Sequence, residues 1–144
     1  SADKVIASPM SDVGSIGVTM SYTENSKKNE EEGITFVPLS TGKYKDAGSP
    51  EKPLTEEERV LFEADLKIVH DEFVKKVAEM RGKSVEEIQS LADGSSMPGV
   101  KALEKGLIDT LGNRQTAKQE FAKNLGLSED QIVFCEYAGK LLPF

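Results

Sequence analysis

The sequence has few of the residues that build cross-linked or metal-bound sites. Its 144 residues include one cysteine, one histidine and no tryptophan. A single cysteine excludes a disulfide within the chain, so folding does not depend on an oxidising compartment. One histidine and one cysteine cannot form a Cys/His zinc cluster, and we expect neither a metal nor a cofactor. Cys135 lies in an apolar run over residues 132–137 and is predicted to be a buried thiol in a strand.

Long apolar runs and an excess of basic residues are also missing. No apolar run approaches the ~20 residues that a membrane-spanning helix needs, and the sequence shows no signal peptide. The formal net charge is −7, from 18 basic and 25 acidic residues. Because nucleic-acid binders need clustered basic residues, this balance argues against a nucleic-acid partner. With 38% hydrophobic and 30% charged residues, the chain can still build a buried core.

The order of apolar and polar segments predicts an α/β fold. Residues 1–39 are strand-rich, with strands expected at 4–7, 15–22 and 34–37 and a short helix at 24–32. Residues 40–54 form a long loop rich in Gly, Pro and Ser/Thr, and long loops in compact domains are often functional. Residues 55–144 are mainly helical, with a final strand at 132–137. This alternation favours parallel strands joined by crossover helices.

Two capping boxes mark helix starts in the second half of the chain. Thr55 is followed three residues later by Glu58, and Ser84 by Glu87 in the same way. The predicted helices span residues 55–81, 84–92, 98–105 and 115–125, with Gly82, Gly106 and Gly126 expected to end three of them. These signals are local, so the helices do not depend on knowing the tertiary fold.

Ser15 lies between two glycines in the run VGSIGV, which suggests a nucleophile. The nucleophile elbow reads Gly-x-Ser-x-Gly on a strand–turn–helix, whereas here the first glycine is one position too close and β-branched residues follow. The only histidine, His70, lies in the middle of a predicted helix among acidic residues, where a solvated side chain is expected. A serine–histidine pair of Ser15 and His70 is therefore not favoured.

A lysine is the other base that can activate a serine. Its pKa, about 10.4 in model peptides, must fall by roughly three units for this work. Lys43 and Lys45 both lie in the 40–54 loop, and in an extended segment they would share a face and lower each other's pKa. The same residues also fit an ordinary solvated loop. From the residues alone, either lysine could be the base, and the segment could equally be an ordinary solvated loop.

Three separate stretches resemble one family. They read SADKVIASPMSDVGSIGV, STGKYKDAGSPEKPLTEEE and LADGSSMPGVKALEKGLIDTLG, and together they cover roughly residues 1–125. In order and spacing they resemble the second half of the catalytic domain of signal peptide peptidase A. That family consists of serine peptidases with a Ser/Lys dyad and a fold related to ClpP and crotonase. The resemblance implies that residues 1–144 are a single partial domain whose N-terminal half is missing.

The resemblance also implies roles for two residues. Lys45, immediately before Asp46, matches the general base of the family's Ser-Gly-x-x-Lys-Asp motif, although Thr41 replaces the usual serine. Ser15 matches the serine of the Thr-Gly-Ser-Ile-Gly motif and would orient Lys45 by a hydrogen bond. The alternative for Ser15 is a serine at a strand entry that bonds the backbone. The nucleophilic serine and the oxyanion-hole glycines lie upstream of the matched region, so we expect this chain to be inactive alone.

A third motif is expected to be structural. Residues 94–112 resemble the family's Ala-Asp-Gly…Gly-x-x-Ala-x-x-x-Gly-Leu-x-Asp stretch, and the matching residues are Gly99, Ala102, Gly106 and Asp109. Small residues let a short helix approach a sheet. Residues 95–97 depart from the family pattern, which leaves details of the substrate groove or of packing open.

The function implied by the resemblance is that of a serine endopeptidase acting on signal peptides or other membrane-derived or unfolded peptides. The expected partners are the peptide substrate and either the missing half or identical subunits of a homo-oligomer. Membrane association, at the bacterial cell membrane, would come through parts absent here, and this fragment is expected to be soluble. The alternatives are a noncatalytic assembly module, a capsid-processing relative from a phage, and the acyl-CoA branch of the same superfold.

Overall fold

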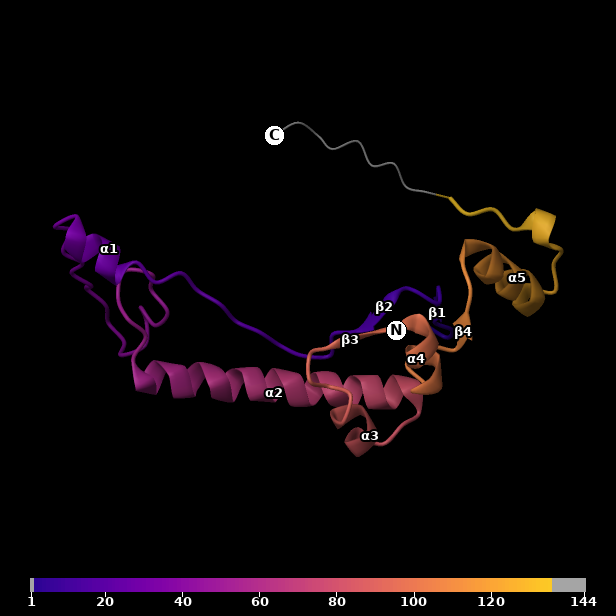
Figure 1. Cartoon of the computed structure of the whole chain (residues 1–144), viewed down its shortest axis with the longest axis horizontal. Helices are drawn as coiled ribbons and strands as arrows, with labels where there is room; N and C mark the ends of the chain where they lie inside the picture. The colour runs from indigo at the N-terminus through magenta and orange to yellow at the C-terminus, as the bar shows by residue number, and fades with distance from the viewer. Residues whose placement is uncertain (1, 136–144) are drawn as a thin grey trace. The chain divides into compact units, whose positions relative to one another are not determined.

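The computed structural model describes residues 2–135 of the chain, and these form two compact units (Figure 1). One unit combines residues 2–14 with residues 96–135, and the other is the continuous segment Ser15–Ser95. The second unit is therefore inserted in the sequence between two parts of the first. The predicted partition of a single partial domain at residues 39/40 and 54/55 stays a prediction.

The first unit contains all four strands of the described residues, in two short pairs. Its elements are β1 (Ile6–Ala7), β2 (Asp12–Gly14), β3 (Ser96–Pro98), α4 (Gly99–Glu104), β4 (Thr110–Leu111), α5 (Arg114–Leu125) and η1 (Glu129–Gln131). β1 pairs with β4 in parallel, and β2 pairs with β3 antiparallel. Its buried apolar residues are Met97, Ala102, Leu107, Ile108 and Ala122. The α/β prediction with parallel strands is confirmed for one pair, while the antiparallel pair was not predicted.

Helix α4 begins in close contact with the chain that follows β1. Gly99 is buried, and a Cβ on it would lie 2.1 Å from the carbonyl oxygen of Ser8. The next backbone N–H, of Val100, donates to the carbonyl of Pro9 at 3.3 Å. Ala102 is fully buried. The expectation that small residues let this helix approach its neighbour is therefore confirmed.

The aspartate that closes the same motif fastens the start of β1. The backbone N–H of Asp109 donates to the carbonyl of Val5 at 2.9 Å, and the N–H of Val5 donates to Asp109 Oδ2 at 2.7 Å. The two residues are 104 positions apart in sequence. This reciprocal pair of bonds extends the parallel β1–β4 ladder by one step beyond its strands.

The second unit consists of three helices and long connecting segments. These are α1 (Ser26–Glu31), α2 (Glu56–Arg81) and α3 (Val85–Gln89). The predicted capping boxes of α2 and α3 are both present, and the glycines predicted to end helices, Gly82, Gly106 and Gly126, all have positive φ. α3 packs against α2, and the buried apolar residues of this unit are Ile16, Val74, Ala78, Ile88 and Ala92. Over residues 2–135, none of the helices has the length and apolar content to cross a membrane.

Two predicted strands do not form, and a third is absent over the part of it that the structure describes. Residues 15–22 and 34–37 have no strand, and neither do residues 132–135, while residues 136 and 137 lie outside the described part. β-Branched residues favour strands only when a neighbouring strand pairs with them, and these segments have no such neighbour among residues 2–135. Val37 and Val133 are accordingly exposed. Cys135 is also exposed, so its predicted burial in a strand is wrong.

Candidate active site

Lys45 lies in a coiled loop that precedes α2. Three backbone hydrogen bonds of 3.1 Å close successive turns, from Lys45 to Gly42, from Ala47 to Tyr44 and from Ser49 to Asp46. Glycine, aspartate and serine are typical of such turns because they tolerate or stabilise tight backbone conformations. The loop thereby presents the exposed side chain of Lys45 from its middle turn.

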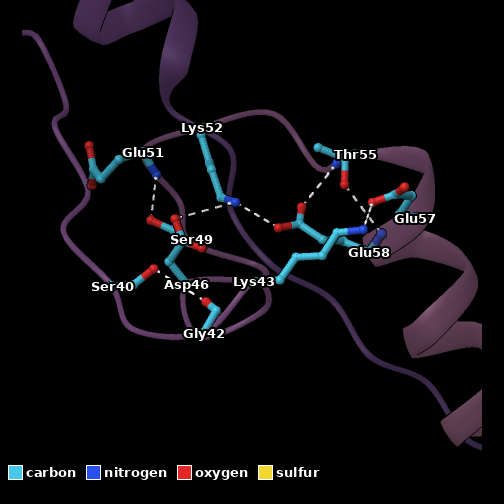
Figure 2. A network of polar contacts seen from close by, with 10 residues as sticks. All are labelled: Ser40, Gly42, Lys43, Asp46, Ser49, Glu51, Lys52, Thr55, Glu57 and Glu58. Atoms are coloured by element: carbon cyan, nitrogen blue, oxygen red, sulfur yellow. Dashed lines mark hydrogen bonds and ion pairs between the residues drawn. The ribbon is translucent and has the colours of Figure 1, made fainter.

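The loop contains two other lysines, and both are paired with carboxylates of α2 (Figure 2). Lys43 Nζ lies 2.6 Å from Glu57 Oε2, and Lys52 Nζ lies 2.6 Å from Glu58 Oε1. Lys45, in contrast, has no ion pair or side-chain hydrogen bond within residues 2–135. Its amine is therefore the one in this loop that no carboxylate occupies.

The two paired lysines are held in their charged form. The hydrogen bond to Glu57 raises the pKa of Lys43, and the hydrogen bond to Glu58 raises the pKa of Lys52. The ammonium of Lys52 in turn lowers the pKa of Glu58, with help from the hydrogen bond donated by the Thr55 backbone. The expectation that Lys43 would have a lowered pKa is wrong, because its nearest charged partner is a carboxylate. Neither lysine suits a base that must lose its proton near neutral pH.

Ser15 has a backbone conformation that sets it apart. It is the one non-glycine residue with positive φ among residues 2–135, at 53°. Its backbone N–H donates to the carbonyl of Ser95 at 2.8 Å, which holds it in place. A left-handed residue other than glycine costs about 1–2 kcal/mol, and such strain often accompanies function. The side chain is exposed and makes no hydrogen bond within the described residues.

The surroundings of Ser15 include the only histidine. Ser15 and His70 both line a surface pocket of about 420 Å³, together with Thr19 and Asp93. His70 is not the solvated residue expected from its helix position: it is half-buried, and its Nε2 donates to the carbonyl of Ala92 at 3.0 Å. No hydrogen bond joins Ser15 to His70. Within residues 2–135, no three His, Cys, Asp or Glu residues gather into a group that could hold a metal ion.

The structure does not bring Ser15 and Lys45 together. The loop of Lys45 is fastened to the first turn of α2 through Glu57 and Glu58. The Ser15 pocket adjoins the same helix at His70, twelve residues further on. At 1.5 Å of rise per residue, these two points are roughly 20 Å apart along the helix. The hydrogen bond expected between the two side chains is therefore absent in this arrangement, and the roles of both residues stay predictions.

Sequence reasoning missed one part of the site. It identified Glu58 as a capping residue, but not that Lys52 bridges Glu58 to Asp46, with 3.4 Å from Lys52 Nζ to Asp46 Oδ2. A lysine six residues before an N-terminal helix glutamate was the available signal. That spacing lies in a loop, where side-chain directions do not follow from sequence.

Comparisons with known proteins give one consistent result. The model of the family described as Peptidase family S49 matches residues 1–128. "Putative protease MJ0651" of Methanocaldococcus jannaschii is 35% identical over 132 residues, 92% of this chain and 42% of that protein. "Putative signal peptide peptidase SppA" of Enterococcus faecium is 31% identical over 92% of this chain and 38% of its own length. "Serine protease SPPA, chloroplastic" of Arabidopsis thaliana is 32% identical over 81% of this chain and 17% of its own length.

Proposed function

Because the chain belongs to peptidase family S49, whose fold is of the ClpP/crotonase type, we propose that it supplies the lysine base of a Ser/Lys peptidase. Lys45 is that base. The observation that carries the proposal is the pairing pattern of the 40–54 loop. Lys43 and Lys52 are neutralised by carboxylates of α2, and Lys45 alone among the three keeps an unpaired amine. The chain spans 42% or less of these three relatives, so the activity of a whole protein is part of the proposal.

The nucleophile is a serine that residues 1–144 do not contain. One relative is named a serine protease, which supports this class of nucleophile. The serine Oγ attacks the peptide carbonyl carbon while its proton passes to Lys45 Nζ. Backbone N–H groups stabilise the resulting oxyanion. The Lys45 ammonium then protonates the leaving amine, which leaves an acyl-enzyme. A water molecule, deprotonated by Lys45, hydrolyses this ester and regenerates the serine.

Ser15 has a supporting role in this scheme. Its exposed, strained backbone position and its side chain without a hydrogen bond are consistent with a hydroxyl kept available for another group. It would accept a hydrogen bond from the Lys45 amine and aim the lone pair of that amine at the nucleophile. In the working enzyme the segments of Ser15 and Lys45 must then approach each other more closely than they do here.

One relative's name supports the proposed substrate class. The Enterococcus faecium protein is named a signal peptide peptidase. We propose that the enzyme to which this chain belongs cleaves signal peptides or other membrane-derived or unfolded peptides. An enzyme acting on such peptides works at a membrane surface, with identical subunits or the remainder of the domain completing the substrate site.

A fluorophosphonate probe followed by intact-mass measurement tests the proposal. The probe is applied to this 144-residue chain and to a longer chain, extended upstream of Ser1 to include the proposed nucleophilic serine, each with Lys45→Ala and Lys43→Ala as a matched pair. We expect an adduct on the longer chain only, its loss in Lys45→Ala and its retention in Lys43→Ala. An adduct on the 144-residue chain at Ser15, or labelling that survives Lys45→Ala, would contradict the assignment.

A second candidate, an assembly module without chemistry, is favoured by one feature of α2. Val60, Ile68, Val69 and Met80 are each at least half exposed along this helix. Such a module would show no labelling in either length of chain and would self-associate. Labelling of the longer chain separates the two, because an oligomer that stays unlabelled at both lengths supports the module and a labelled longer chain supports the peptidase.

A further inference from the structure

Three charged side chains, Asp46, Lys52 and Glu58, form a cluster at the start of α2 (Figure 2), and Asp46 directly follows the proposed base in the sequence. Lys52 Nζ sits between two carboxylates, 2.6 Å from Glu58 Oε1 and 3.4 Å from Asp46 Oδ2. The side chains are 25%, 4% and 22% exposed for Lys52, Glu58 and Asp46. Each group is therefore largely shielded from solvent, unlike the Lys43–Glu57 pair, whose side chains are more than 60% exposed.

Glu58 is the fixed end of this cluster. It is the one buried charged residue among those described, and both of its carboxylate oxygens are engaged. Oε1 accepts from Lys52, and Oε2 accepts from the backbone N–H of Thr55 at 3.0 Å. The backbone N–H of Glu58 donates to Thr55 Oγ1 at 3.2 Å. The carboxylate is thus held by the capping box of a 26-residue helix, which gives Lys52 a rigid partner.

Asp46 connects the cluster to the proposed base, Lys45. It follows Lys45 directly, so their Cα atoms are about 3.8 Å apart. The Asp46 carbonyl accepts from Ser49, and the Lys45 N–H donates to Gly42, so both residues belong to the same coil of turns. Fixing the Asp46 carboxylate therefore limits the rotation of the backbone from which the Lys45 side chain extends.

We infer that Lys52 is a positioning residue for the proposed base: it clamps Asp46 to Glu58 and so holds the Lys45 turn against the start of α2. This inference rests on the proposed function of Lys45. Lys52 itself does not take part in proton transfer. The positional requirement is strict, because a misplacement of about 1 Å in a reacting group can cost about 10²-fold in rate.

The test measures labelling kinetics of the same longer chain, extended upstream of Ser1, with the fluorophosphonate probe. The limiting rate of labelling reports activation of the serine, and the half-saturating probe concentration reports probe binding. We expect Lys52→Met to lower the limiting rate about 10- to 100-fold while the half-saturating concentration changes less than about twofold. Lys52→Arg keeps the charge and can contact both carboxylates, so it should restore most of the rate. Lys43→Met, which removes the exposed Lys43–Glu57 pair of the same loop, is the matched control and should label like the parent.

A second variant covers the case in which Lys52→Met fails to fold. Asp46→Asn leaves the Lys52–Glu58 pair and the α2 cap intact and removes only the attachment of the turn, so it should lower the limiting rate in the same direction. If Lys45→Ala abolishes labelling while Lys52→Met and Asp46→Asn label at the parent rate, the clamp is refuted and the base assignment stands. If Lys45→Ala labels at the parent rate, the proposed function fails and the clamp fails with it. An equal loss in Lys43→Met, or no rescue by Lys52→Arg, would also overturn the inference.

Discussion

The close approach of α4 to the chain after β1 makes Gly99→Ala a sharp test of the first unit. The new Cβ would lie 2.1 Å from the carbonyl oxygen of Ser8, whereas real Cβ atoms essentially never come closer than 3.0 Å to another heavy atom. The neighbour is a backbone group, so it cannot rotate away as a side chain would. The start of α4 must therefore move by about 1 Å or force Ser8 and Pro9 to move.

The size of the effect follows from the contacts that this movement disturbs. The hydrogen bond from Val100 to Pro9 is already 3.3 Å long, so a further 1 Å breaks it. Overpacking of this kind costs about 1–3 kcal/mol. Opening of the unit releases this strain, so the equilibrium population in which the β1–β4 pair is open should rise about 5- to 150-fold.

Amide hydrogen exchange measured by NMR provides the assay. The N–H of Gly112, which donates to Ala7 beside the β1–β4 pair at 2.9 Å, reports on opening of the unit. We expect its exchange to accelerate by the factor above in Gly99→Ala. Val100→Ala, in the same turn but on a side chain that is 45% exposed, is the control and should exchange like the parent. Unchanged exchange in Gly99→Ala, with a native spectrum, would show that α4 does not approach Ser8 as described.

Two further predictions concern the start of α2 and the acidic limit of stability. Thr55→Ala should lower the free energy of unfolding by about 1 kcal/mol, measured by urea titration followed by circular dichroism. Thr55→Ser should lower it less, because serine keeps the capping hydroxyl. Equal losses in the two variants would argue against the cap. In the folded protein, the hydrogen bond from Lys52 lowers the pKa of Glu58, and the hydrogen bond from Lys4 lowers the pKa of Glu120. The two carboxylates therefore stabilise the fold fully above pH 4.5, their ordinary pKa. This stabilisation is lost as the pH falls through their lower pKa values in the folded protein. The thermal midpoint should therefore fall on acidification below 4.5 and fall less steeply in Glu58→Gln; identical pH profiles would contradict this account.

The helices were predictable because their signals are local. The predicted helix over residues 55–81 is observed at Glu56–Arg81, and its start depends on Thr55 and Glu58, which are neighbours on one turn. Its end depends on Gly82, whose left-handed conformation needs no distant partner. A capping box or a terminal glycine acts through atoms a few residues apart, so one sequence is enough to find it.

The strands were predicted poorly because pairing is not local. Residues 15–22 are rich in β-branched and apolar side chains, yet the observed β2 ends at Gly14, just before them. Its partner β3 begins at Ser96, more than eighty residues away in the chain. A strand exists only where another strand supplies the opposite ladder, and composition does not show where that ladder is.

The site was predicted in part for the same reason. The roles of Lys45 and Ser15 were proposed from the sequence resemblance and stay predictions, whereas Glu58 was identified through its capping box. The bridge by Lys52 joins positions 46 and 58 through a loop, with no periodicity to indicate it. His70 shows a related failure, because its helix position predicts exposure, but a carbonyl 22 residues away accepts a hydrogen bond from its ring.

The anchoring of the two predicted site residues suggests which of them moves if the proposed hydrogen bond between them forms. Lys45 is attached to α2 through the shielded Asp46–Lys52–Glu58 cluster and the capping box beneath it. Ser15 is held by a backbone bond to Ser95, and the neighbouring residue Ile16 accepts one from Gly94. Residues 17–25 between Ser15 and α1 have no regular secondary structure, whereas the Lys45 loop is closed by three successive turns. Moving the Ser15 segment would break two backbone hydrogen bonds, whereas moving the Lys45 loop would break the charged cluster and three turns. For the hydrogen bond that we propose between the two side chains, we therefore expect the Ser15 segment to be the one that moves. On this proposal, the Asp46–Lys52–Glu58 cluster holds Lys45 in place while the other catalytic groups approach it.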